Sequence, residues 1–181
     1  MRGLGAATAA FLLLFTASAE AKTDSRTGGA QYQAESAGSR SARAERLPHG
    51  RASIPPSAPP EVQELVRRGN NLVGKPYVWG GGHDPDFGVG GPGYDCSGSV
   101  SYVLRKLLEQ PLASGGLSAW GMPGKGKWVT IYANGGHAYM VVAGLRLDTS
   151  AAGDPSGLDG PRWRPNLRSN EGFVARHPGT L

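Results

Sequence analysis

Apolar residues recur at helical spacing immediately after a proline-rich stretch. They would share one face of a helix and are Val62, Leu65, Val66, Leu72 and Val73. Gly74 and Pro76 follow this series, and both residue types commonly end helices. The pattern therefore predicts an amphipathic helix that begins after Pro60 and ends before Gly74.

A second apolar series follows the spacing i, i+4, i+7, i+8 and i+11. Its members are Cys96, Val100, Val103, Leu104 and Leu107. Asp95 stands where an N-cap residue is favoured, and Pro111 ends the pattern. The sequence therefore predicts a second helix with the cysteine in its first turn.

Three short segments rich in β-branched and aromatic residues predict strands over 128–132, 137–142 and 145–149. The turn residues Asn134-Gly135-Gly136 and Ala143-Gly144 separate them. Because helices precede a run of antiparallel strands, the predicted class is α+β, with N-terminal helices packed on a small antiparallel sheet.

The chain after residue 150 carries little periodicity. We expect one short strand over 173–175 and loop elsewhere, including Arg162 to Pro165.

The N-terminal third has a different composition. Arg2, an apolar run from Leu4 to Ala17 and small residues up to Ala21 predict a signal peptide over residues 1–21, and the alternative is a retained N-terminal anchor. We expect export to the periplasm or to the cell wall and medium, with membrane contact only through the signal peptide.

Residues 22–60 are rich in Ser, Ala, Arg and Pro and contain one aromatic residue. This composition provides little apolar surface to offset the entropy of ordering, and it predicts a disordered linker. The catalytic domain is expected over 61–181, and we expect a monomer.

Charge and cysteine content exclude several classes. The net charge is only +5, and the sequence shows no cluster of basic residues in the expected domain, which argues against nucleic-acid binding. The single cysteine excludes an intrachain disulfide framework and cysteine-rich zinc sites. No metal or other cofactor is expected.

Cys96 is a candidate nucleophile because a helix N-terminus favours thiolate over thiol. The alternative is a small buried apolar residue. Of the four histidines, His137 follows a glycine turn and opens a strand, where its ring can be held rigidly. His83 lies in a glycine-dense loop beside Asp84 and Asp86, a pattern that fits a solvated turn better than a cation loop.

A third residue is needed to orient the imidazole. If Ala143-Gly144 is a two-residue hairpin loop, Val142 pairs with Leu145, and Asp148 lies diagonally beside His137 on one face. A shift of one residue would place Thr149 there instead.

Three ordered motifs now form a recognisable pattern. Pro76-Tyr77-Val78-Trp79-Gly80-Gly81, Tyr94-Asp95-Cys96-Ser97-Gly98-Ser99-Val100 and Gly136-His137-Ala138-Tyr139 resemble the NlpC/P60 cell-wall cysteine peptidases over about residues 61–150. The resemblance implies a circularly permuted papain-like core with Cys96 as nucleophile and His137 as general base. It also implies that Tyr77 and the Cys96 backbone amide assist the oxyanion.

The chain departs from the family pattern at the residue that orients the catalytic histidine. This residue is more often His, Asn or Gln in the family, whereas here it would be Asp148. Trp79, Arg162 and Arg164 are candidate substrate-binding residues, because stem peptides carry carboxylates that an arginine binds well. Core packing for the tryptophan and a solvated surface for the arginines are the alternatives.

The sequence therefore predicts an exported cysteine hydrolase that cleaves an amide bond in peptidoglycan stem peptides. Two alternatives remain open. One is an inactive wall-binding or scaffolding protein of the same fold, and the other is an amidase or acyltransferase acting on a non-wall substrate.

Overall fold

The computed structural model describes residues 42–181. The expected signal peptide and the first part of the expected linker lie outside the described residues. Within the described part of the chain, no helix is long and apolar enough to cross a membrane.

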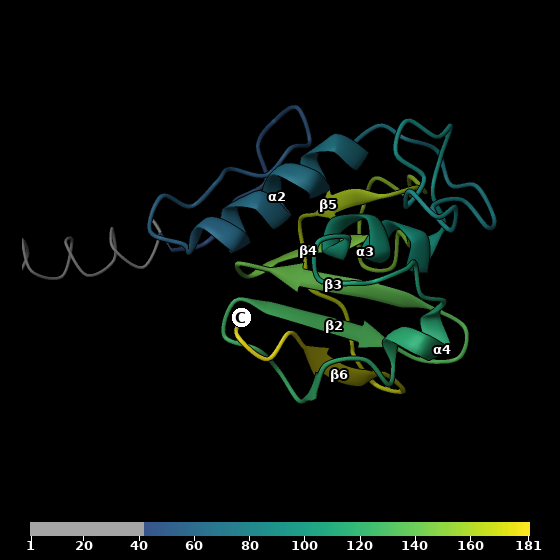
Figure 1. Cartoon of the computed structure of the whole chain (residues 1–181). Helices are drawn as coiled ribbons and strands as arrows, with labels where there is room; N and C mark the ends of the chain where they lie inside the picture. Colours follow the sequence, from purple (N-terminus) through teal and green to yellow (C-terminus); the bar gives the residue numbers. More distant parts are fainter. Residues whose placement is uncertain (1–41) are drawn as a thin grey trace, which may run out of the picture.

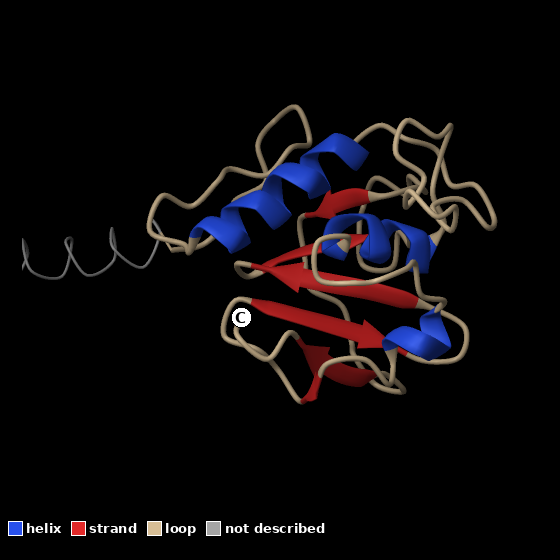
Figure 2. Cartoon of the chain, in the orientation of Figure 1, coloured by secondary structure: helices blue, strands red, loops and turns tan. Residues whose placement is uncertain are grey.

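A six-stranded antiparallel sheet forms the centre of the molecule, with strand order β1-β6-β2-β3-β4-β5 (Figures 1 and 2). The strands are β1 (Met122–Pro123), β2 (Val129–Ala133), β3 (Ala138–Val142), β4 (Leu145–Asp148), β5 (Arg162–Arg164) and β6 (Val174–His177). The helices are α2 (Pro60–Leu72), α3 (Cys96–Leu104) and α4 (Ser114–Leu117). The predicted α+β class is confirmed.

Helices α2 and α3 pack against one face of the sheet, where α3 contacts β3 and α2 contacts β3 and β5 (Figure 1). The core between them is made of fully buried aliphatic side chains. Val66, Leu104, Met140 and Leu147 are representative. Removing such side chains from water is the main source of folding free energy.

The predicted hairpin register is confirmed. Val142 pairs with Leu145, and Met140 pairs with Leu147. Ala143 and Gly144 both have positive φ, as a two-residue hairpin turn requires. Asp148 therefore lies on the sheet face opposite to Leu147.

Helix α3 ends at Leu104, so it is shorter than the apolar series up to Leu107 predicts. Leu107 is exposed and makes a short backbone hydrogen bond to Leu104.

The expectation of a disordered linker over 22–60 is wrong for its described part, residues 42–59. Ala44 and Ala52 are buried there, and Arg46 and Ala52 form a β-bridge. Composition underestimates the order because the side chains that pack are small alanines, and most tertiary hydrogen bonds of the segment involve its backbone, while the Arg46 side chain donates to the carbonyl of Trp163.

A further difference is strand β5, in a region expected to be loop. Its three residues pair with β4, and Trp163 is fully buried against α2, directly over Gly69. A side chain at Gly69 would overlap the indole ring. A strand of three residues is too short for the alternation of apolar and polar residues to be recognised in the sequence.

Asn70 joins three parts of this framework. Its side chain donates to the carbonyl of Ala52, accepts from the Ala52 amide at 2.7 Å, and accepts from the indole N–H of Trp163 at 2.8 Å. One amide on α2 thus holds both the 42–59 segment and β5.

We predict that Asn70→Ala lowers the free energy of unfolding by about 2 kcal/mol, because three hydrogen bonds are lost and their partners remain partly buried. Denaturant unfolding measures the change. Asn71→Ala is the matched control, since Asn71 is exposed on the same helix and should change stability by about 0.5 kcal/mol or less. Equal effects of the two substitutions would contradict the assignment.

Candidate active site

Cys96 begins α3, and Asp95 caps that helix by accepting a hydrogen bond from the Gly98 amide at 2.7 Å. The same carboxylate accepts from the Gly80 amide at 3.1 Å and contacts Nε2 of His83 at 3.1 Å. Asp95 therefore ties the glycine-dense loop to the start of the helix, and its negative charge is engaged by these groups.

The loop lies very close to the helix backbone. A Cβ atom on Gly98 would lie 2.0 Å from the carbonyl oxygen of Gly81, so only glycine allows this approach. His83 is held there by Asp95 and by the Ser97 hydroxyl, at 3.2 Å, rather than lying in a solvated turn. The close packing fixes the surroundings of the Cys96 thiol.

His137 is positioned by the turn that precedes it. The side-chain oxygen of Asn134 accepts hydrogen bonds from the backbone amides of Gly136 and His137, both at 2.9 Å. Nε2 of His137 lies 2.9 Å from Oδ1 of Asp148, which leaves Nδ1 as the nitrogen that can face another group.

The Cys96 thiol and the His137 imidazole lie close enough to shift each other's pKa. Burial raises the pKa of Cys96, but the hydrogen bonds with His137 and with the backbone of Ala138 and the imidazole charge outweigh it, so the thiol pKa lies below its ordinary value. Asp95 opposes this lowering. The site favours a thiolate.

The pKa of His137 is shifted in the opposite direction. Burial lowers it, but hydrogen bonds and charges from Asp148 and Cys96 raise it more strongly, to about 9. The ordinary value is 6.5, so the protonated ring stabilises the fold fully below that pH, and the contribution is lost as pH rises through about 9. The imidazole is thus protonated at neutral pH, and its charge favours the thiolate form of Cys96.

Asp148 is surrounded by cations that sequence reasoning did not connect to it. Its side chain has no exposed surface, and Oδ2 lies 3.3 Å from a guanidinium nitrogen of Arg168 and 3.8 Å from Nε of Arg146. The Ser150 amide donates to Oδ1 at 2.8 Å. The spacing of Arg146 and Asp148 on one predicted strand was the available signal for that contact, whereas nothing local marked Arg168.

Aromatic rings enclose the exposed side of the imidazole. The ring centroids of Phe173 and Tyr139 lie 6.1 and 6.3 Å from that of His137. These contacts add a rigid wall from β3 and from the segment before β6.

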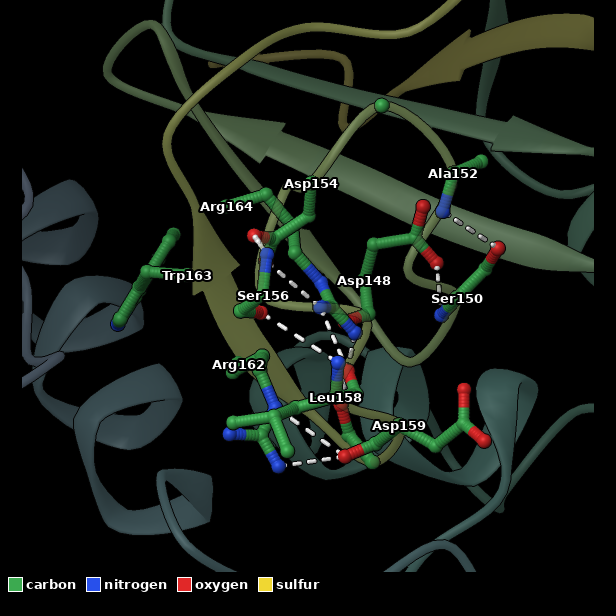
Figure 3. A network of polar contacts seen from close by, with 12 residues as sticks. Asp148, Ser150, Ala152, Asp154, Ser156, Leu158, Asp159, Arg162, Trp163 and Arg164 are labelled. Atoms are coloured by element: carbon green, nitrogen blue, oxygen red, sulfur yellow. Dashed lines mark hydrogen bonds and ion pairs between the residues drawn. The ribbon is translucent and has the colours of Figure 1, made fainter.

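Arg164 is not a substrate-binding residue, which corrects the sequence prediction. Its guanidinium is fully buried, pairs with Asp154 at 2.8 Å and donates to the backbone carbonyls of Asp148 and Thr149 (Figure 3). The neighbouring Arg162 donates to the carbonyl of Asp159. Arg162 and Arg164 both project from the face of β5 opposite to Trp163, because successive residues of a strand point to opposite faces.

Tyr77 lies close to the candidate nucleophile, as expected. It is 41% exposed, and burial together with the charges of Cys96 and Asp95 raises its pKa. With His137, Ser150 and Asp159 it lines a cavity of about 270 Å³.

Trp79 does not line that cavity. Its side chain is 87% exposed and projects from the loop that precedes the helix. Its assignment as a substrate-binding residue has no support from the cavity geometry.

Within residues 42–181, no group of three or more His, Cys, Asp or Glu side chains is arranged to hold a metal ion.

We predict that Asp148→Asn lowers the pKa of His137 by about one unit or more, because the carboxylate charge that favours the imidazolium is removed. NMR titration of the imidazole ring measures the shift. Asp154→Asn is the matched control, since Asp154 pairs with Arg164 instead. An unchanged His137 pKa in the Asp148 variant would contradict this account of the ion pair.

No protein-family model matches the chain. Two curated relatives are peptidoglycan endopeptidases RipA. The protein from Mycolicibacterium smegmatis is 42% identical over 49 residues, which cover 24% of this chain and 10% of the relative. The protein from Mycobacterium tuberculosis is 40% identical over 58 residues, which cover 28% of this chain and 12% of the relative. The probable endopeptidase YafL of Escherichia coli is 43% identical over 51 residues, covering 28% and 18%.

The chain thus spans less than a fifth of the length of these curated relatives. Among solved structures, the P60 domain of antigen MAP1204 from M. avium subspecies paratuberculosis aligns with a TM-score of 0.45 at 23% identity, over 64% of this chain and 93% of that chain. Over 49 to 58 residues this chain is therefore similar to peptidoglycan endopeptidases, which agrees with the resemblance of its three motifs to the NlpC/P60 cell-wall peptidases.

Proposed function

We propose that this chain is a cysteine hydrolase that cleaves an amide bond in the stem peptides of peptidoglycan. The observation that carries the proposal is the chain of contacts from the Cys96 thiol through His137 to the buried Asp148 carboxylate. The names of the curated relatives, peptidoglycan endopeptidases among them, support the choice of substrate.

The ion pair supplies both groups that amide cleavage needs. The Cys96 thiolate attacks the carbonyl carbon, and the C–N bond breaks as the imidazolium of His137 passes its proton to the departing amine. A thioester remains. Water, giving its proton to the now neutral His137, then attacks the thioester carbon, and the thiolate leaves as the carboxylic acid product forms.

Two donors are proposed to stabilise the oxyanion of each tetrahedral intermediate. The backbone amide of Cys96 lies at the start of α3, where amides lack helical partners. The Tyr77 hydroxyl has a pKa raised above 10.0, so it is a neutral donor at physiological pH. Asp148 is proposed to orient His137 through the 2.9 Å contact at Nε2.

We further propose that the protein acts outside the cytoplasm, at the cell wall. Peptidoglycan is an extracytoplasmic polymer, and the apolar N-terminal sequence followed by small residues would direct export there. We expect the chain to act on this substrate as a monomer.

We predict that Cys96→Ala lowers the release of new amino groups from purified sacculi by about a thousandfold or more, because the chain has no other thiol. Mass spectrometry of the released muropeptides identifies the bond that is cut. Lys106→Ala, an exposed change just beyond α3, is the control and should retain full activity. Undiminished cleavage by the alanine variant would overturn the mechanism.

A further inference from the structure

A second cavity, of about 390 Å³, lies on the sheet face opposite to α2 and α3. Its walls include Thr130 and Tyr132 of β2, Tyr139 of β3, and Arg168 and Asn170 from the segment after β5, with Lys125 at its rim. It is separate from the cavity that Tyr77 and His137 line.

The polar groups of this cavity are suited to an anion. Lys125 and Arg168 are cations, and no carboxylate lines the cavity in the described part of the chain. Within residues 42–181, the Lys125 ammonium and the hydroxyls of Tyr132 and Tyr139 have no hydrogen-bond partner. A cavity of this size, lined by two cations and two phenolic hydroxyls, offers donors that suit an oxyanion.

A further buried cation lies next to the cavity. Arg146 is the cross-strand partner of Val141, whose side chain lines it, so both side chains project from the same sheet face. The guanidinium of Arg146 is fully buried, and none of its three nitrogens has a hydrogen-bond partner in the described residues. A buried cation with unsatisfied donors raises the local potential and favours a nearby negative charge.

The neighbouring charges do not cancel. Asp148 is the carboxylate that pairs with Arg146 and Arg168, and it also pairs with His137. Arg164, on the same sheet face as Arg146, pairs with Asp154. One carboxylate therefore faces three cationic side chains, and the region around the cavity keeps an excess of positive charge.

The cavity floor fits an organic anion. Tyr132 and Tyr139 stack with ring centroids 5.0 Å apart and an interplanar angle of 15°. Their rings offer a flat apolar surface beside the donors, which suits a carboxylate carried on a carbon chain.

We propose that this cavity is a subsite for a carboxylate, held by Lys125, Arg168 and the hydroxyls of Tyr132 and Tyr139. Its assignment to a carboxylate of the wall peptide rests on the proposed function. Arg168 connects the subsite to the catalytic groups, since it lies 3.3 Å from Asp148 and its guanidinium carbon lies 5.3 Å from the Tyr139 ring centroid.

Binding is tested without turnover by NMR titration of the ¹⁵N-labelled chain with sodium acetate and, separately, inorganic phosphate at constant ionic strength. We expect acetate to give saturable shifts at residues 125–132 and 167–170. Lys125→Met should weaken acetate binding by about threefold or more, because one charged donor is lost. Lys127→Met is the matched control, since Lys127 is equally exposed and contacts Trp128 instead, and it should bind as the wild type does.

The titration can also overturn the proposal. Absence of saturable shifts, or an equal loss in the Lys127 variant, would show that the cavity is not an anion site. Saturation by phosphate alone would refute the carboxylate and point to a phosphate ligand.

The substrate assignment is tested by steady-state kinetics on a stem peptide in its free-carboxylate and carboxamide forms. Lys125→Met should raise KM for the carboxylate form about threefold to tenfold and leave kcat and the carboxamide form unchanged. An unchanged KM alongside positive acetate binding would overturn the peptide assignment. Failure of the wild type to cleave either peptide would refute the proposed function, whereas the NMR result would still decide the anion site.

Discussion

The burial of the Asp148 carboxylate is the constraint on which the rest of the site depends. A carboxylate with no exposed surface is stable only when charges and hydrogen bonds replace its water. His137, Arg168 and Arg146 supply the charges, and the Ser150 amide supplies a further donor. Burial lowers the pKa of His137, but hydrogen bonds and charges from Asp148 and Cys96 raise it to about 9, and the imidazole in turn lowers the pKa of Cys96.

This constraint gives the C-terminal part of the chain a structural role. Arg164 on β5 donates to the backbone carbonyls of Asp148 and Thr149, and Arg168 comes from the segment that follows. Phe173 packs against the imidazole from the same region. Residues after 150 lie outside the three sequence motifs. They complete the surroundings of His137 and Asp148 and form one wall of the second cavity.

Local patterns predicted the parts of the fold whose determinants are local. The helix starting at Cys96 follows from Asp95 and an apolar series, and the hairpin register follows from a two-residue turn. The order of residues 42–59 and strand β5 could not be predicted in this way. Asn70 holds Ala52 and Trp163, which are far from it in the sequence and were not linked to it by any periodicity.

Short-range patterns in the sequence place a cysteine at a helix start, a histidine after a glycine turn, and an aspartate on the next strand of the same hairpin. Turn geometry and the two-residue period of strands are properties of short segments, so the pairing of His137 with Asp148 follows from them. Packing between distant segments, in contrast, buries Asp148 among arginines, makes Arg164 structural and brings Arg168 to the site. Those outcomes depend on distances between segments separated by many residues, and electrostatic effects follow distance and burial rather than sequence order.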